Sequence, residues 1–397
     1  MRHPSLPAWL RAALALFATG WGANHFAALL PVYRADDGLS QTVVTSLFAA
    51  YVLGLIPALL LAAVVGRRVG HRLVIRWVLV GAVCGSAVLA LADGRPTWLL
   101  VGRVLYGACM GAAMAPGTTW VKELSADAPT GTGARRAAIA MSAGFGGGPL
   151  VSGALAQWAP LPHLLPYAVH IALAVVVAVL VWNAPQPGEP AHGAAHHAPG
   201  PVRTLAFWTR IAPTAPGVFT CASVGIVVVP SLVHEQTRGL LVAFTGLAAG
   251  LTLGTGVLVQ QPARRLAAHA ADRVSLLGGA AAVVGIAVTA ALAARPSIPL
   301  AMVGCVVLGA GYGLVLVGGL TRVEQQATPS ALAMTNAVFY SLTYLGFFVP
   351  TFVSVLGDRW SLRTVLLGFA GLAAGCTMLT AIASRHERRV ATVAGAA

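Results

Sequence analysis

Long apolar runs separated by short polar gaps constrain this chain more than any other feature. We predict twelve of them, at residues 10–33, 40–64, 74–92, 97–121, 134–157, 164–183, 207–232, 239–261, 274–294, 298–320, 331–356 and 361–383. Each is about 20 residues long, the length of helix that crosses the hydrocarbon core of a bilayer. Because backbone groups in lipid must be paired internally, helices are the expected form. The chain is therefore predicted to be an all-α integral membrane protein.

The charged residues agree with a lipid bilayer as the partner of this chain. Only 9% of the residues are charged, whereas soluble domains carry about a quarter. The net charge of +14 would suit a nucleic-acid binder, but the charges lie in the gaps between apolar runs and not on one face. We therefore expect no nucleic acid. Most Lys and Arg residues fall in gaps on the same side of the membrane as the N-terminus. The positive-inside rule therefore predicts that both termini are cytoplasmic, in a protein of the inner (plasma) membrane.

Two halves of the chain resemble each other on either side of a polar stretch. That stretch, residues 184–205, is rich in Pro, Gly and His and is predicted to be a cytoplasmic linker. In the first span of each half, Ala23 matches Ala222 at an offset of 199 residues. In the fourth, VGRVLYGACMGAAMAPGTTWV (residues 101–121) matches VGCVVLGAGYGLVLVGGLTRV at an offset of 202. We predict two pseudo-symmetric six-helix bundles, residues 1–183 and 206–397.

This layout, with a basic loop after the second span, resembles the major facilitator superfamily. The family's loop motif, G-x-x-x-D-R-x-G-R-R, corresponds here to AVVGRRVGHR at residues 63–72. Arg68, Gly70 and Arg72 are kept, but Arg67 replaces the Asp that normally joins an inter-helix charge cluster. The resemblance implies twelve spans and a secondary transporter that works by alternating access around a midplane site. It also implies a small-molecule substrate and no cofactor.

The fourth span contains an ionisable residue, Arg103, in a pattern similar to the family's R-x-x-x-G, which ends here at Gly107. A charge inside a span costs about 2.5–3.5 kcal/mol on insertion scales, so it is expected to face a wet cavity or a partner. Arg103 also lies near the start of its span. The alternative is therefore a side chain that reaches outward to the membrane interface.

The fifth span carries a signature similar to G-x-x-x-G-P-x-x-G-G, which marks the antiporters of the superfamily. Here it comprises Gly144, Gly148, Pro149 and Gly153, with Ser152 in place of the penultimate Gly. The glycines permit close helix approach, and the proline removes a backbone donor and can bend the helix. We expect this segment to act in gating, and the alternative is ordinary packing of small residues.

Candidate groups for the substrate and proton pathway are few, because every Asp and Glu falls in a loop or at a span end. His25, next to Asn24 in the first span, and His170 in the sixth are the buried groups that could titrate. Either could instead be a hydrogen-bonded histidine between helices. Further polar candidates are Tyr51, Tyr312, Asn336, Tyr340 and Tyr344. The last three recur every four residues and therefore share one face of a helix. We expect this face to contact the substrate, and the alternative is that it forms hydrogen bonds to neighbouring helices.

Charged residues at the predicted cytoplasmic ends of the spans are candidates for a latch that seals this side. They are Arg68, Arg72, Glu123, Arg135, Arg265 and Glu324. Exposed ion pairs are individually weak, so the alternative is that these ends are simply solvated.

Enzyme motifs are missing from the sequence. The single lysine, Lys122, is not part of a P-loop, and no G-x-S-x-G occurs. We expect no metal site, because the histidines His192, His196 and His197 are interpreted as ordinary polar residues of the linker. The sequence therefore predicts a monomeric transporter that exports a neutral or anionic compound in exchange for protons. The alternatives are an uptake permease, a proton-independent facilitator or exchanger, and a non-transporting receptor with the same fold.

Overall fold

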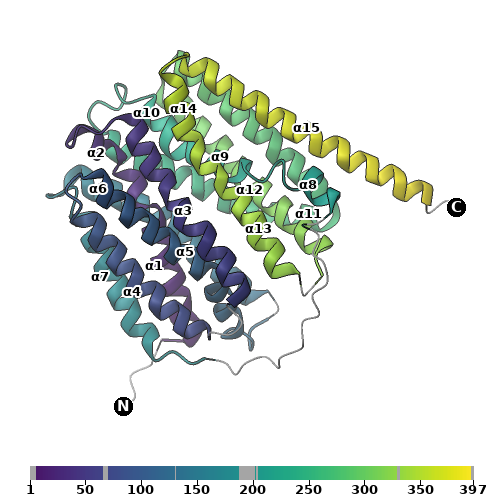
Figure 1. The fold of residues 1–397 in the computed structure, drawn as a ribbon, viewed down its shortest axis with the longest axis horizontal. Helices are drawn as coiled ribbons and strands as arrows, with labels where there is room; N and C mark the ends of the chain where they lie inside the picture. Colours follow the sequence, from purple (N-terminus) through teal and green to yellow (C-terminus); the bar gives the residue numbers. More distant parts are fainter. Residues whose placement is uncertain are drawn as a thin grey trace. The chain divides into compact units, whose positions relative to one another are not determined.

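The computed structural model describes residues 6–65, 70–129, 131–186, 202, 204–328 and 331–394 (Figure 1). Within these residues nearly every segment is helical and no β-strand occurs. Most of the predicted linker, including its three histidines, and the basic-loop residues 66–69 lie outside the described part. By internal contacts the chain divides into two compact units.

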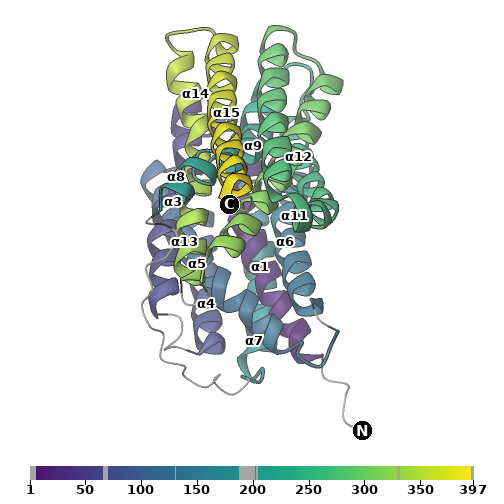
Figure 2. The ribbon, with the colours of Figure 1, turned by 90° about the vertical axis from the view of Figure 1, so that its right-hand side faces the viewer.

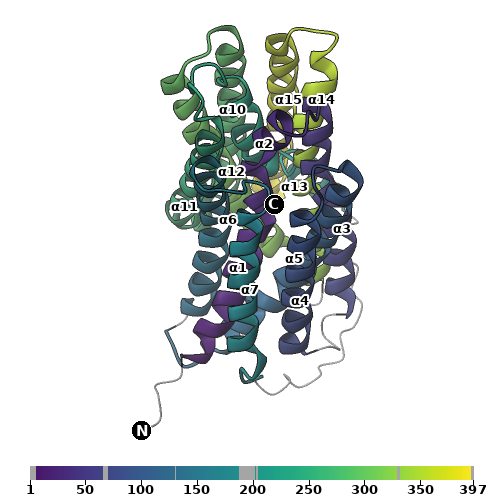
Figure 3. The ribbon, with the colours of Figure 1, turned by 90° about the vertical axis from the view of Figure 1, so that its left-hand side faces the viewer.

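Unit 1 consists of residues 1–194 together with residues 240–250. Its helices are α1 (Ala8–Ala28), α2 (Leu30–Ala35), α3 (Gln41–Val65), α4 (His71–Ala90), α5 (Pro96–Glu123), α6 (Thr132–Trp158) and α7 (Leu165–Trp182). Helix α1 lies inside the unit and packs against α5, α6 and α7, and α4 lies beside α7 (Figure 3). Small residues dominate α1, which lets three neighbouring helices approach it closely.

Two ends of unit 1 can be distinguished by its core and loops. Trp120 near the end of α5 packs in one buried cluster with Ala12 of α1 and Val181 of α7. Helix α1 therefore begins at the end of the unit where α5 and α7 finish. The loops at residues 36–40 and 159–164 connect helices at the opposite end. At that end α1 breaks at Leu29 and continues as α2, because Pro31 in the first turn of α2 has no N–H to extend the helix.

Unit 2 consists of residues 195–239 and 251–397. Its helices are α8 (Leu205–Arg210), α9 (Gly217–Ser223), a π-helical turn (Val224–Val228), α10 (Val229–Ser231), α11 (Leu241–Ala294, which starts in unit 1), α12 (Ile298–Gln326), α13 (Leu332–Tyr344), a 3₁₀ turn (Leu345–Phe348), α14 (Val349–Gly357) and α15 (Leu362–Ala394). Helix α9 packs against α12, and α14 against α15 (Figure 2).

The segment expected as one apolar helix at residues 207–232 is broken. Pro213 and Pro216 separate α8 from α9, because neither can donate a helical hydrogen bond. The polar gap expected at residues 262–273 contains a break at Ala270, whose backbone is non-helical (φ −152°, ψ 57°). Two helices meet at this kink within the 54 residues of α11. Helical structure extends into the polar stretch on either side of Ala270, because its Ala, Leu and Arg residues are strong helix formers.

Ten helices in the described part of the chain are long and apolar enough to cross a membrane. One of them is α11, whose 54 residues form two helices that meet at the kink at Ala270, and each of these parts is long enough to cross a bilayer core of about 30 Å. The shorter apolar segment Gly217–Ser231 is additional. The multi-pass helical architecture expected from the sequence is thus confirmed, whereas the count of twelve crossings in two six-helix bundles stays a prediction.

Candidate functional site

The Arg103 side chain is completely buried in unit 1. Helix α5 projects it towards α1 and α3, where its Nε donates to the Leu47 carbonyl at 3.2 Å and its Nη2 to the Phe48 carbonyl at 2.8 Å. The Nη1 group donates to the Ala23 carbonyl at 3.3 Å. No carboxylate contacts it among the described residues. The guanidinium therefore holds together three helices while its positive charge has no counter-ion.

Aromatic rings enclose this cation. Its central carbon lies 4.7 Å from the centre of the Phe26 ring, 4.8 Å from Tyr51 and 5.8 Å from Phe48. Ring faces attract a cation and exclude water from it. Arg103 and Tyr51, two residues predicted for the pathway, are therefore neighbours, and the alternative that Arg103 reaches outward to the interface does not describe this structure.

His25 is fully buried in α1, and neither of its ring nitrogens has a hydrogen-bond partner among the described residues. Its ring contacts Tyr167 at 4.8 Å, His170 at 5.0 Å and Tyr106 at 5.9 Å between ring centres. Unpartnered buried polar groups are rare and costly in native proteins, so they indicate a functional role or an exchangeable partner. His25 is therefore the residue in this cluster that can accept a proton without losing a bond.

His170 differs from His25 because both of its ring nitrogens are engaged. Its Nε2 lies 3.0 Å from the carbonyl of Ala18 and its Nδ1 lies 2.8 Å from the hydroxyl of Ser86. A carbonyl only accepts, so Nε2 carries the proton and Nδ1 accepts from the serine. The Tyr106 hydroxyl, 3.3 Å from Nε2, donates to the Thr19 carbonyl at 3.2 Å. These contacts hold the His170 ring in place between α1 and α4.

The glycine signature of α6 joins this helix to its neighbours backbone against backbone. A Cβ on Gly144 would lie 2.8 Å from the Trp21 nitrogen, and one on Gly148 would lie 3.0 Å from the Trp21 carbonyl carbon. Both glycines therefore face α1. Gly153 faces the start of α11, where a Cβ would lie 3.0 Å from the Val242 carbonyl oxygen. Pro149 is buried between these two contacts.

In unit 2, predicted pathway tyrosines belong to a cluster of aromatic rings. Tyr344 stacks on Phe219 with ring centres 4.2 Å apart, and Phe219 also contacts Tyr312 at 5.9 Å and Phe347 at 4.9 Å. Two of the predicted pathway tyrosines are thus brought together through Phe219.

The rest of the predicted polar stripe on α13 is less enclosed. Asn336 and Tyr340 are half-buried, unlike the buried Tyr344, and the side-chain oxygen of Asn336 has no hydrogen-bond partner among the described residues. Asn24, which precedes His25 in unit 1, is buried.

The residues predicted to form a charge latch do not pair with one another in the described part of the chain. Glu123 contacts His71 at 3.3 Å, and Arg72 donates to the Ala184 carbonyl at 3.3 Å. Arg135, Arg265 and Glu324 are exposed, and Arg68 lies outside the described residues.

A buried charge cluster in unit 2 escaped the sequence analysis. Arg322 near the end of α12 is only 2% exposed, and it bonds the Asp272 carboxylate and the Arg210 carbonyl. It also donates to the Ser384 hydroxyl at 3.1 Å, and Arg210 lies 3.5 Å from Asp272. The signal available in the sequence was that Asp272-Arg273 follows the eighth span, the place where the first half has its basic loop.

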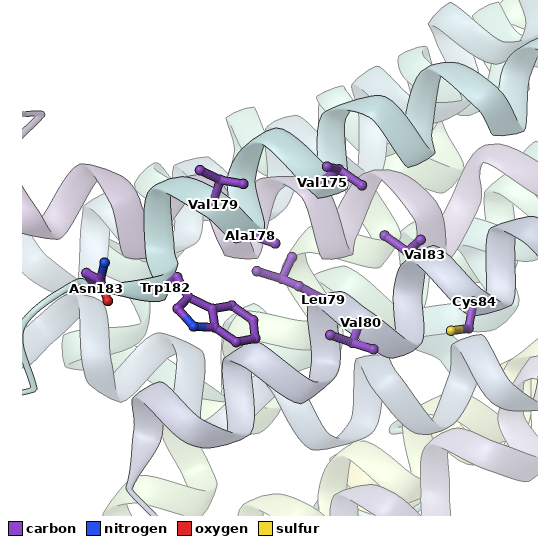
Figure 4. Close-up of a pocket in the computed structure, with 9 residues that line it drawn as sticks. All are labelled: Leu79, Val80, Val83, Cys84, Val175, Ala178, Val179, Trp182 and Asn183. Atoms are coloured by element: carbon purple, nitrogen blue, oxygen red, sulfur yellow. The ribbon is translucent and has the colours of Figure 1, made fainter.

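An apolar groove of about 580 Å³ lies between α4 and α7, away from the Arg103 cluster (Figure 4). Leu79 and Val83 line one side, Val175 and Val179 the other, and Trp182 lies near one end. With almost no polar lining, the groove lacks the convergent polar groups that a site for a polar ligand needs.

Comparisons with known proteins agree on one family and one fold. The family model described as Major Facilitator Superfamily matches residues 12–351. Among solved structures, the nucleoside transporter NupG is 13% identical with a TM-score of 0.70, over 96% of this chain and 98% of that chain. An auto-inhibited peptide transporter of the POT family is also 13% identical with a TM-score of 0.70, over 95% and 96%. At these identities the likeness concerns the fold. No curated protein sequence matches the chain.

Proposed function

This chain belongs to the Major Facilitator Superfamily and is a multi-pass membrane transporter rather than an enzyme, and we propose that it exports a small neutral or anionic organic compound in exchange for protons. The observation that carries this proposal is the environment of Arg103. A buried guanidinium bonded only to carbonyl groups keeps its positive charge uncompensated. A permanent cation brought near it is repelled, whereas an anion or a polar neutral molecule is attracted.

Proton exchange is assigned to His25. Its two ring nitrogens have no partner, whereas those of His170 are committed to Ala18 and Ser86. A proton can therefore bind and leave His25 without breaking a hydrogen bond. In the described residues the membrane-spanning helices of unit 1 hold no Asp or Glu away from their ends that could take this role instead.

Export rather than uptake is supported by the glycine signature in α6, which is similar to that of antiporters. Gly144 and Gly148 put α6 directly on the backbone of α1, the helix that carries His25. A movement of α6 is therefore transmitted to α1 without an intervening side chain. The resulting transporter has alternating access, and we assign it a monomeric state with both termini in the cytoplasm.

Twelve crossings remain the proposed topology. They follow from the ten apolar helices when α11 is counted twice, on either side of Ala270, and the segment Gly217–Ser231 is added. Helices α2, α8 and α10 are too short to be separate crossings.

A proton-independent facilitator is the second candidate, because membrane carboxylates are the usual proton carriers. Among the described residues, Asp272 within α11 is paired with Arg322, and the other Asp and Glu residues lie in loops or near helix ends. The two candidates predict different consequences for the same compound. An antiporter moves protons whenever the compound moves, whereas a facilitator moves the compound alone.

The test uses the purified protein in liposomes that enclose a pH-sensitive dye. Uridine and alanyl-alanine serve as neutral probes, because the structural neighbours are named for nucleosides and peptides. Benzenesulfonate and N-methylpyridinium form a size-matched anion and cation pair. We expect a neutral or anionic probe to change the internal pH, and the signal to vanish in His25→Gln but persist in His170→Gln. Transport of N-methylpyridinium that depends on Arg103, or transport of a probe without a pH change, would contradict the proposal.

A further inference from the structure

Titratable side chains continue from His25 to the loops at residues 36–40 and 159–164. The Tyr167 ring meets the His25 ring edge-on at 4.8 Å, and the Tyr167 hydroxyl lies 2.7 Å from the Tyr33 hydroxyl. The Tyr33 ring in turn lies 5.5 Å from the ring of His163, whose Nε2 is 3.0 Å from the Asp37 carboxylate. Five residues from α1, α2, α7 and the two loops thus form one unbroken row of contacts.

The exposure of the row changes along its length. The side chains of His163 and Asp37 are 30% and 20% exposed, whereas Tyr33, Tyr167 and His25 are buried. Water therefore reaches the loop end of the row, and the row ends at the histidine without a hydrogen-bond partner. A polar row of this kind is expensive to bury in a helical bundle, and packing alone would be satisfied by apolar residues.

We propose that this row conducts protons between the loop end of unit 1 and His25, along a path separate from that of the transported compound. Its role in coupling rests on the proposed antiport, with His25 as carrier. Asp37 holds His163 in place and stabilises it when it is protonated. Each tyrosine hydroxyl can accept a proton on its oxygen while it donates its own, so charge passes along the row and neither residue is consumed.

The transfer proceeds in a fixed order. His163 passes a proton to the Tyr33 oxygen, the original Tyr33 proton moves to the Tyr167 oxygen, and the original Tyr167 proton moves to a ring nitrogen of His25. The ring contacts at His163–Tyr33 and Tyr167–His25 exceed hydrogen-bond length, so proton transfer at each of them requires a bridging water molecule. The middle step needs no water, since the two hydroxyls are already 2.7 Å apart.

The remaining groups around His25 do not extend the row to the opposite end of the unit. Tyr106 and Arg103 from α5 donate to backbone carbonyls of α1 or α3. His170 from α7 is bonded to Ala18 and to Ser86 of α4. These groups are engaged, so the proton stops at His25.

The test follows hydrogen exchange at the His25 ring, for which the probe is the deuteron itself. Protein labelled with ¹⁵N-histidine is placed in liposomes and transferred from H₂O to D₂O buffer. Solid-state NMR then follows the ring N–H signal that is missing from His25→Gln. We expect exchange to slow by at least about tenfold in Tyr33→Phe and in Tyr167→Phe, since each removes one proton-transfer step but keeps the ring. Tyr106→Phe is the matched control and is expected to exchange like the wild type.

The outcomes separate the route from the transport function. Unchanged exchange in Tyr33→Phe and Tyr167→Phe, equal slowing in Tyr106→Phe, or no exchange in the wild type overturns the route. A further outcome is slowed exchange in both tyrosine variants while the wild-type liposomes show no pH change when a compound is added. That result supports the proton route and overturns antiport. Melting temperatures are expected to fall modestly in all three variants, because each loses one buried hydrogen bond. A single cooperative unfolding transition in each variant excludes misfolding as the cause.

Discussion

The two halves of the chain differ most at positions that correspond in sequence. The residue that matches Arg103 is Cys305, and the residue that matches His25 is Val224. Cys305 is buried like Arg103, but its thiol makes one weak contact of 3.7 Å to the Gly225 carbonyl, whereas Arg103 makes three hydrogen bonds. At these two corresponding positions the same helical framework therefore holds a charged residue in one half and neutral residues in the other.

At the other ends of α5 and α12 the charge difference is reversed, because here unit 2 has the charged residue and unit 1 the neutral one. Trp120 near the end of α5 corresponds to Arg322 near the end of α12. Both are buried; Trp120 donates to the Pro185 carbonyl at 3.1 Å, and Arg322 pairs with Asp272. Each unit thus buries one cation along this helix, at different depths. We infer that the cation of unit 1 acts on substrate and protons, and that the paired cation of unit 2 fixes helices.

The largest effect is expected when Arg103 is replaced by its counterpart. In Arg103→Cys, proton-coupled transport should fall by about 1,000-fold, equivalent to roughly 4 kcal/mol in the barrier, because the site loses a buried charge that has no counter-ion among the described residues. The reciprocal control, Cys305→Ser, should stay within about twofold of the wild type. Initial rates in liposomes measure both. Equal losses in the two variants would mean that the halves contribute alike.

The buried pair of unit 2 should dominate stability rather than transport. Asp272→Asn leaves Arg322 buried without its counter-charge, which is expected to cost about 3 kcal/mol. Glu123→Gln removes a half-exposed contact to His71 and should cost less than about 1 kcal/mol. Thermal unfolding in detergent compares the two variants. A smaller loss in Asp272→Asn than in Glu123→Gln would show that the cluster has no structural role.

A glycine pair of α6 tests whether the signature acts through helix contact. Gly148→Ala forces a Cβ against the Trp21 backbone and should destabilise unit 1 by about 2 kcal/mol and slow transport. Gly147 is the matched control, because a Cβ there would meet no atom within 4 Å. Gly147→Ala should be neutral or slightly stabilising, since alanine favours the helix. Equal melting temperatures for the two variants would contradict the contact.

The smallest effect is expected at the aromatic cluster of unit 2. Tyr344→Phe keeps the ring stacked on Phe219 and removes only a hydroxyl, so KM should rise by about threefold at unchanged kcat if the hydroxyl contacts substrate. Tyr344→Ala removes the stack and should raise KM further. A fall in kcat at constant KM would assign this cluster to coupling and would erase the distinction between the halves.

Hydropathy was sufficient to predict the membrane helices, because a bilayer imposes one length and one composition on every span. It failed where local chemistry decides. Pro213 and Pro216 interrupt an apolar run, and the Ala-rich stretch around Arg264 stays helical despite its charges. The prolines leave the mean hydropathy of their run almost unchanged, whereas the charges around Arg264 lower the mean hydropathy although the backbone there stays helical. Hydropathy therefore could not reveal either feature.

The residues of the candidate site could be predicted from the sequence, but their hydrogen-bond partners could not. Arg103 and His25 were chosen because ionisable groups inside spans are costly, and both are buried. Which of the two histidines forms hydrogen bonds depends on how α1 is rotated against α7. That rotation is set by the packing of Gly and Ala residues between the helices. Arg322 lies just beyond the predicted span 298–320, because hydropathy does not show that α12 continues past this residue.

The most direct test of the account is the direction in which a pH gradient drives accumulation. Liposomes that are acidic inside should concentrate the transported probe above its external level, since each outgoing proton exchanges for an incoming molecule. Liposomes that are alkaline inside should not, and His25→Gln should only equilibrate the probe. Accumulation in alkaline liposomes would mean symport, and equilibration in both by the wild type would mean a facilitator; either result contradicts proton exchange at His25.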